Sequence, residues 1–264
     1  MKKILKLAVS GLLVIGLTAG LAGCGGAKEE AKTAEPAAKK TVTIATNAAF
    51  APYEYQDPKT GELTGFDMEL IREIGKIAGF EVEIKNMGFD GVIQAVASKQ
   101  VDGAISGMTI TDDRKKMFNF SDPYINSDQS IAVLAANDTM KTEKDLENKR
   151  LVAQIGTTGA IKAKSIKGAT VKELDTIDLA FMELKNGKAD AVVNDLPVSQ
   201  NYISKGNSDV KISGIIKTNE QYGIAFNKDN TELLNKVNAA LKTMKENGKY
   251  NELYKKWFGT EPQQ

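Results

Sequence analysis

Residues 102–124, which read DGAISGMTITDDRKKMFNFSDPY, carry the groups best suited to chemistry. The segment opens with a short apolar run typical of a buried strand, and the small and hydroxylic residues after it leave N–H groups and hydroxyls uncommitted to a core. Thr111 and the two acidic residues behind it predict a capped helix start, just ahead of Arg114. From this position the Arg114 guanidinium can reach back over the strand end, beside the free N–H groups and hydroxyls. Together these groups can bind a small carboxylate. The alternative is an ordinary surface pair between Arg114 and Asp112 or Asp113.

The composition removes several classes of site. Histidine is absent, and the single cysteine is Cys24. Zinc, copper and iron sites of the usual His/Cys kind are therefore not expected, and a Ser–His or Cys–His nucleophile pair cannot be built. Calcium held by carboxylates stays open, although the sequence lacks a spaced DxDxDG loop. We expect no metal, no cofactor and no disulfide within the chain.

The first residues indicate export. Residues 1–23 hold three lysines near the start, an uncharged apolar run over residues 7–21 and small residues before Cys24. This pattern predicts a signal peptide, because the apolar run is short for a bilayer span. The sequence LAGC at residues 21–24 resembles the bacterial lipobox, which implies cleavage before Cys24 and a lipid on its thiol. Two or more acyl chains anchor a protein stably.

Residues 24–40 predict a lipid-anchored disordered tether, because residues 25–40 contain no apolar side chain larger than alanine. Of the 35 lysines and arginines, three leave with the signal peptide, so 32 basic side chains remain against 34 acidic ones. A balance this close to neutral does not indicate nucleic acid or an electrostatic membrane surface as a partner.

From residue 41 onward, patterns typical of strands and helices alternate. Strands are predicted at residues 41–46, 81–85, 101–106, 151–154, 171–174, 189–193 and 224–226. Helices are predicted at residues 65–78, from 90 onward, at 177–185 and at 231–247. The apolar face of the first helix is formed by Leu70, Ile71, Ile74, Ile77 and Ala78. The β-α-β-α-β order of the first half predicts an α/β fold with a parallel sheet covered by helices. Aromatic residues at helical spacing over residues 250–258 are interpreted as packing.

Two further strand-like runs, residues 127–135 and 217–224, enclose a central block. If that block is one lobe, both runs cross between lobes, and the last helices return to the first lobe. We expect a discontinuous first lobe of residues 41–127 and 222–264 and a second lobe of residues 128–221. Because ligands bind beyond the carboxyl ends of strands in open α/β sheets, two facing lobes would share one cleft.

Six ordered motifs make a family resemblance specific. They are GFDMELIREIGKIA, TITDDRKK, FSDPY, QIGTTG, ADAVVNDLP and YGIAF. In this order they resemble the family 3 solute-binding proteins of ABC transporters for polar amino acids, over essentially the whole chain from residue 41. The closing run GKYNELYKKWFGTEP is most similar to the glutamine-binding members. The resemblance implies a type II periplasmic-binding-protein fold, with two lobes, two hinge strands and a ligand cleft between the lobes.

The resemblance also implies roles for single residues. Arg114 would clamp the α-carboxylate of an amino acid, and Asp195 would accept from its α-ammonium, so that each buried charge is matched. The groups that would assist them are the backbone N–H groups of Thr109 and Thr158, the Thr109 hydroxyl, the Gly107 carbonyl, the aromatic walls Phe50 and Phe89, and Ser106 at the strand end. Core packing is the alternative for each phenylalanine, and a helix cap is the alternative, or an additional role, for Asp195.

The resemblance also implies that side-chain specificity is set at three positions, which here hold the amides Asn47, Gln154 and Asn194. An amide both donates and accepts, so the three could satisfy a ligand carboxamide without burying a charge. Glutamine is therefore the favoured ligand. Arginine stays open, since amide oxygens can hold a guanidinium and Glu54 could contribute if it faces the cleft.

The sequence thus predicts a monomeric, lipid-anchored substrate-binding component of an ABC importer, on the outer face of the cell membrane. Its partners would be an amino acid and the permease subunits. A dehydratase-like enzyme on this fold is less expected, because it would need a cleft acid or base with a shifted pKa and has less use for an intact amino-acid clamp. A sensor module is the third alternative.

Overall fold

The computed structural model describes residues 40–262. The expected signal peptide, Cys24 and nearly all of the expected tether lie outside the described residues. Within residues 40–262, none of the helices combines the length and the apolar character that crossing a bilayer requires.

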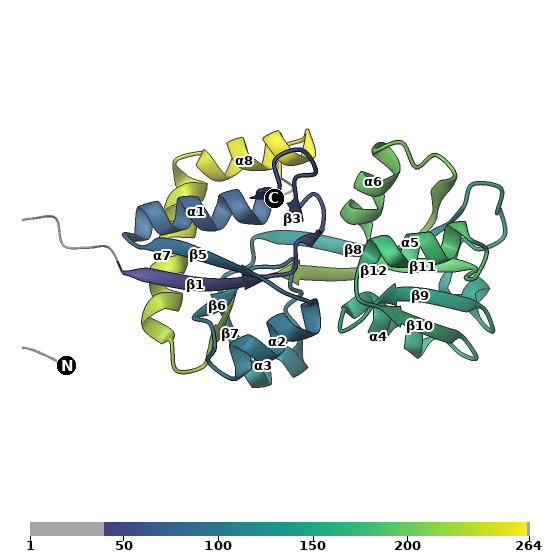
Figure 1. The fold of residues 1–264 in the computed structure, drawn as a ribbon, viewed down its shortest axis with the longest axis horizontal. Coiled ribbons are helices and arrows are strands. Elements are labelled where there is room, and N and C mark those ends of the chain that lie inside the picture. Colours follow the sequence, from purple (N-terminus) through teal and green to yellow (C-terminus); the bar gives the residue numbers. More distant parts are fainter. Residues whose placement is uncertain (1–39, 263–264) are drawn as a thin grey trace, which may run out of the picture. The chain divides into compact units, whose positions relative to one another are not determined.

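The first sheet is built around β1 (Thr41–Thr46), whose Val42 and Ile44 side chains are buried. β1 pairs in parallel with β5 on one side and with β6 on the other, as the predicted β-α-β-α-β order requires. Two strands from later in the chain pair antiparallel beyond β6 (Figure 1). In spatial order the strands are β5 (Glu81–Asn86), β1, β6 (Gly103–Ala104), β13 (Ala225–Asn227) and β7 (Phe118–Phe120). The predicted strand at residues 101–106 is thus much shorter than expected.

Amphipathic helices bury their apolar faces in this first lobe. They are α1 (Phe66–Ala78), α2 (Phe89–Ala97), α7 (Thr231–Glu246) and α8 (Lys249–Phe258). The short helix α3 (Asp112–Met117) buries only Arg114. Gly79, with a φ of 80°, ends α1 in the left-handed conformation that glycine permits. The prediction that Ile77 belongs to the apolar face of α1 is wrong, since its side chain is 42% exposed. Ile77 lies at the edge of the stripe that the buried residues form.

The second sheet, like the first, combines parallel and antiparallel strand pairs. β9 pairs in parallel with β10 and β11, and β8 joins β11 and β12 in antiparallel pairing. In spatial order the strands are β10 (Thr170–Leu174), β9 (Arg150–Gln154), β11 (Ala191–Asp195), β8 (Ile125–Leu134) and β12 (Val210–Tyr222). The helical segments of this second lobe are η1 (Glu143–Leu146), α4 (Thr158–Ser165), α5 (Ile177–Lys185) and α6 (Leu196–Ser204). The predicted helix at residues 177–185 is confirmed.

Strands β8 and β12 connect the two sheets. They pair from Ile125 opposite Tyr222 to Leu134 opposite Val210. β8 follows β7 of the first sheet, and β12 leads into β13, so the two long strands run side by side between the lobes (Figure 1). The predicted crossing runs fall on these strands, and β12 begins earlier than predicted because much of it belongs to the second sheet. The two-lobed α/β architecture with two hinge strands is therefore confirmed.

A small third sheet was not predicted. Its strands are β2 (Ala49–Phe50), β3 (Glu54–Gln56) and β4 (Leu63–Thr64). Strands of two or three residues carry too little alternation to be recognised in a sequence. This sheet nevertheless places Phe50 and Glu54 at the site described below.

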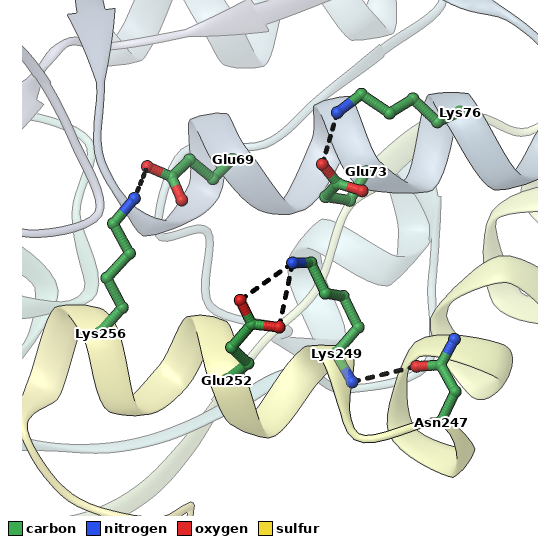
Figure 2. A network of polar contacts seen from close by, with 7 residues as sticks. All are labelled: Glu69, Glu73, Lys76, Asn247, Lys249, Glu252 and Lys256. Carbon is green, nitrogen blue, oxygen red and sulfur yellow. Dashed lines mark hydrogen bonds and ion pairs between the residues drawn. The ribbon is translucent and has the colours of Figure 1, made fainter.

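Helix α8 packs against α1 through aromatic rings. The ring centroid of Phe66 lies 6.0 Å from that of Tyr250 and 5.3 Å from that of Phe258. Figure 2 shows the polar contacts over this packing, in which Lys256 Nζ of α8 reaches Glu69 Oε1 of α1 at 2.6 Å. Exposed ion pairs contribute at most about 1 kcal/mol, so the rings hold α8 in place. The predicted packing role of these aromatic residues is confirmed.

Candidate functional site

A pocket lies where the chain leaves the carboxyl ends of strands in both sheets, the position at which α/β sheets bind ligands. β1 and β6 lead into it from the first lobe, and β9 and β11 lead into it from the second. The predicted ligand-binding residues that line it are Asn47, Phe50, Phe89, Ser106, Gly107, Thr109, Arg114, Gln154, Thr158 and Asp195. Glu54 and Thr157 line it as well. The structure thus gathers residues that are far apart in the sequence.

Asn194 does not line this pocket, which corrects its predicted position. It is buried in β11, and its Nδ2 lies 3.5 Å from Ser199 Oγ and 3.4 Å from the Asp195 carbonyl oxygen. Successive side chains of a strand point to opposite faces. Because Asp195 faces the pocket, its neighbour Asn194 faces away from it.

Arg114 is held by its own helix start. The Thr111 hydroxyl caps α3 by accepting from the Arg114 N–H, as predicted. The guanidinium then donates from Nη1 to the Thr109 carbonyl at 2.8 Å and from Nη2 to the Gly156 carbonyl at 3.0 Å. Its carbon Cζ lies 5.4 Å from the centre of the Phe89 ring. The side chain is therefore oriented by groups from both lobes.

The alternative of a surface ion pair for Arg114 is wrong. Asp112 pairs with Lys115 and Asp113 pairs with Lys116, whereas Arg114 is only 6% exposed. No ion pair within 4.0 Å joins Arg114 to any acid in residues 40–262. Burial lowers the pKa of Arg114, against the opposing influence of nearby acids. A guanidinium has five N–H donors, so a buried cation with unused donors can still take an anion.

Asp195 closes β11 and is buried. Its carboxylate accepts from the Tyr222 hydroxyl and from the Gln129 side-chain amide. Burial raises the pKa of Asp195 to about 7; the negative charge of Glu220 adds to the rise, while these hydrogen bonds and Arg114 oppose it. Asp195 stands at the N-cap position of α6, as the helix-cap alternative predicts, but its side chain makes no capping bond to the helix. An acid that is costly to ionise is a suitable partner for an incoming ammonium.

The amides Asn47 and Gln154 bind each other across the pocket. Gln154 Nε2 donates to Asn47 Oδ1 at 2.7 Å and to the Asp175 carbonyl at 3.1 Å, and Asn47 Nδ2 donates to the Met87 carbonyl at 2.9 Å. Gln154 Oε1 is buried without a partner among the described residues. The expectation of three amides free to surround a carboxamide is therefore wrong in its geometry, since Asn194 faces away and the other two share a bond.

Glu54 adds a second acceptor. It is fully buried, and its Oε1 accepts from the Ser106 hydroxyl at 3.2 Å. That hydroxyl also accepts from the Asn47 backbone N–H at 2.9 Å, so Ser106 holds pocket groups in place. Glu54 Oε2 receives no hydrogen bond from a donor among the described residues, although a proton on Glu54 can bridge it to the Asp67 carboxylate. Burial, reinforced by the neighbouring Asp67 carboxylate, raises the pKa of Glu54 well above its usual range.

The apolar wall depends on a glycine. Gly107 has a φ of 50°, and a Cβ added there would lie 3.0 Å from the Phe50 ring. Phe50 and Phe89 are both buried, so they combine core packing with a place in the pocket wall. Thr157 caps α4 by accepting from the Ala160 N–H at 3.2 Å, which leaves the N–H groups of Thr158 and Gly159 at the helix start to serve an anion.

The sequence reasoning missed three residues of the hinge strands, Gln129, Glu220 and Tyr222. Gln129 is a polar residue, yet it is fully buried in β8, just before the apolar residues of the same strand. A polar residue buried in such a strand must find hydrogen-bond partners in the interior. Its position in the strand-like run was therefore the sequence signal that could have identified it. Tyr222 is the first residue of the YGIAF motif and Glu220 lies two positions before it, but neither side chain carries a signal of its own.

Comparisons with known proteins identify the family of the chain. Residues 42–260 match the model of the bacterial extracellular solute-binding proteins, family 3. The arginine-binding extracellular protein ArtP of Bacillus subtilis (strain 168) is 35% identical over 264 residues, which cover 98% of each chain. A probable histidine-binding protein of Neisseria gonorrhoeae is 34% identical over 251 residues, which cover 91% of each. An ancestral arginine-binding protein solved bound to glutamine is 44% identical, with a TM-score of 0.81 over 84% of this chain and 99% of that chain.

The family match confirms the resemblance carried by the six motifs, and proteins of this family bind solutes and are not enzymes. The chain belongs to the bacterial extracellular solute-binding proteins, family 3.

Proposed function

We propose that this protein captures an α-amino acid with a cationic side chain, with L-arginine as the favoured ligand, and delivers it to an ABC permease. The α-carboxylate binds the free donors of Arg114 and the N–H groups at Thr158 and Thr109. The α-ammonium binds Asp195 and the Gly107 carbonyl. Both charges of the zwitterion are then matched inside the protein, as burial requires.

The observation that carries the choice of side chain is the pair of buried acceptors without a donor in the pocket wall, Gln154 Oε1 and, once Glu54 has given up its proton, Glu54 Oε2. A buried acceptor without a donor costs about 1–3 kcal/mol. A guanidinium supplies five donors and no acceptor, so it can satisfy both oxygens at once. The name of the relative ArtP, an arginine-binding protein, supports the same choice.

Glutamine is the second candidate. It is favoured by the closing sequence run, and the ancestral arginine-binding protein that is 44% identical to this chain was solved with glutamine bound. Glutamine presents the same α-carboxylate and α-ammonium, but its side chain offers two N–H donors and a carbonyl that needs a donor of its own.

A thermal-shift panel of the common amino acids on ligand-stripped, refolded protein tests this proposal. L-arginine at about 100 times its dissociation constant should stabilise the protein by about 2.7 kcal/mol, which is roughly 5–11 °C for a chain of this size. Glutamine should give a smaller shift at equal concentration. The absence of a shift with every amino acid would contradict the function, and a larger shift with glutamine would contradict the side-chain choice.

We further propose that residues 1–23 are a signal peptide, that Cys24 carries the lipid, and that residues 24–40 tether a monomer to the outer face of the membrane. Residues 41–127 and 222–264 would form the first lobe and residues 128–221 the second. The intact mass of membrane-extracted protein checks the anchor, since a chain that starts elsewhere than at a lipid-bearing Cys24 contradicts it.

A further inference from the structure

A β-bulge interrupts the hinge strand β12 just before Glu220, where its pairing with β8 shifts register. Asn219 has a φ of 50° in this bulge. A single carboxylate of β8, that of Asp128, holds it. Asp128 Oδ1 accepts from the N–H groups of Thr218 at 3.0 Å and Asn219 at 3.1 Å, and its Oδ2 lies 2.7 Å from Lys217 Nζ. The backbone leading to Glu220 is therefore held in place by β8.

The side chain of Glu220 reaches hydroxyls of both lobes. Its Oε2 accepts from Thr109 Oγ1 at 2.8 Å and from Thr158 Oγ1 at 2.8 Å. Thr109 follows β6 of the first lobe, and Thr158 begins α4 of the second. The two hydroxyls lie 3.3 Å apart. Gln129 Nε2 of β8 approaches both carboxylate oxygens at 3.3 Å.

We propose that Glu220 is the closing residue of the hinge: its carboxylate joins Thr109 and Thr158, holds the two lobes together and thereby slows release of the bound solute. Both bonds can form only while the lobes are close together, so they favour the closed arrangement. The effect on release rests on the amino-acid binding proposed above, whereas the effect on the lobes does not. Glu220 is a positioning residue, since it acts on the ligand through the two threonines.

The bonds to Glu220 also reassign the Thr109 hydroxyl. Its hydrogen points to Glu220, so in this arrangement the hydroxyl cannot also donate to the ligand's carboxylate. The N–H groups and Arg114 are left for that task. The sequence-based expectation that the Thr109 hydroxyl assists Arg114 directly is replaced by an indirect role.

Glu220 is also coupled to the ammonium site. Gln129 Nε2 donates to Asp195 as well as to Glu220, so the two acids share one amide. The titratable groups that face Asp195 are Arg114, Tyr222, Tyr53, Glu54 and Glu220. Neutralising Glu220 removes a negative charge from this set, which makes Asp195 easier to ionise.

The first arm of the test measures the distance between the lobes without ligand. Spin labels are placed at the exposed positions Lys59 and Lys167, in a full chain whose only cysteine has been replaced (C24S). Glu220→Ala should shift the distance distribution to longer and broader separations, and Glu220→Gln, which keeps one acceptor, should fall between. Gln221→Ala is the matched control, because the side chain of this exposed neighbour bonds only Asn126 across the hinge and its removal should leave the distribution unchanged.

The second arm measures dissociation of L-arginine by stopped flow. Glu220→Ala should accelerate release about tenfold or more, since it removes two hydrogen bonds to a charged acceptor. Glu220→Gln should in addition move the acid limb of the binding–pH profile to lower pH, through Asp195. A purely structural role would not move that limb, and Gln221→Ala should not move it either.

An unchanged distance distribution in Glu220→Ala would overturn the proposal. Slower release or tighter binding in that variant would also overturn it, because Glu220 would then compete with the ligand's carboxylate. If wild-type protein fails to bind arginine, the proposed function fails, yet the distance arm still decides the role of Glu220.

Discussion

Replacing Arg114 with alanine is expected to weaken amino-acid binding on the order of 10²–10³-fold while leaving the protein folded. Removing one partner of a buried charge pair costs about 3–5 kcal/mol, and each 1.4 kcal/mol is tenfold in affinity. The fold should survive, because without ligand the guanidinium forms no ion pair in the described residues and its loss also removes a buried cation. Titration calorimetry measures the affinity, and thermal denaturation measures the stability.

Two variants control this experiment. Arg72→Ala removes an exposed arginine of α1, which donates to the Leu63 carbonyl at 3.1 Å, and should leave binding unchanged. Arg114→Lys keeps the charge but cannot hold the Thr109 and Gly156 carbonyls and a carboxylate in one planar fork. It should recover only part of the affinity. Near-native affinity in Arg114→Ala would contradict the assignment of Arg114 to the α-carboxylate of the ligand.

Asp195→Asn is expected to lose a comparable share of affinity and yet to stabilise the unliganded protein at pH 8. The pKa of Asp195 is raised by burial from about 3.8 to about 7. A raised pKa contributes stability that is present below 3.8 and is lost as the pH rises through 7. At pH 8 wild type must therefore keep a buried carboxylate ionised, whereas asparagine carries no charge. The melting temperature of Asp195→Asn should exceed that of wild type at pH 8, and the difference should shrink toward pH 4.

The same pKa predicts how binding depends on pH. Below about 7 the α-ammonium must displace a proton from Asp195, so wild-type affinity should fall as the pH is lowered from 7.5 to 5.5. Calorimetry in buffers of different ionisation enthalpy should detect proton release at pH 5.5. Binding of a ligand's guanidinium should release an additional proton from Glu54, because burial raises the pKa of Glu54 as well. Affinity that is constant over this range, or a less stable Asp195→Asn at pH 8, would contradict the ammonium assignment.

Much of the fold could be read from the sequence because its long elements have strong periodicity. The helix at residues 177–185 was predicted with its observed bounds, and helix α7 was predicted within one residue at its end. The two strand-like runs predicted to cross between the lobes overlap the hinge strands β8 and β12. The β2–β4 sheet was missed, since its strands are too short to show a period and are defined by their neighbours.

The site was predictable where a motif ties a residue to a local structure. Thr111 caps the helix that positions Arg114, and both lie within one segment. Asn194 was misplaced although the rule of strand alternation excludes it beside Asp195. The bond between Asn47 and Gln154 joins residues that are 107 positions apart, and the bond from Glu220 to Thr109 spans 111. Only the folded chain reveals such pairings, and only the folded chain reveals the buried acceptors Gln154 Oε1 and Glu54 Oε2, which shift the favoured ligand from glutamine to arginine.

The central claim is that the pocket holds both charges of an α-amino acid and presents acceptors to a cationic side chain. Calorimetric titration of stripped wild-type protein with L-arginine, L-citrulline and L-glutamine tests it most directly, because citrulline has nearly the shape of arginine without the charge. We expect all three to bind, with arginine at least about tenfold tighter than citrulline, since hydrogen bonds to a charged group contribute about 1.5–3 kcal/mol. Citrulline or glutamine binding as tightly as arginine would contradict the account.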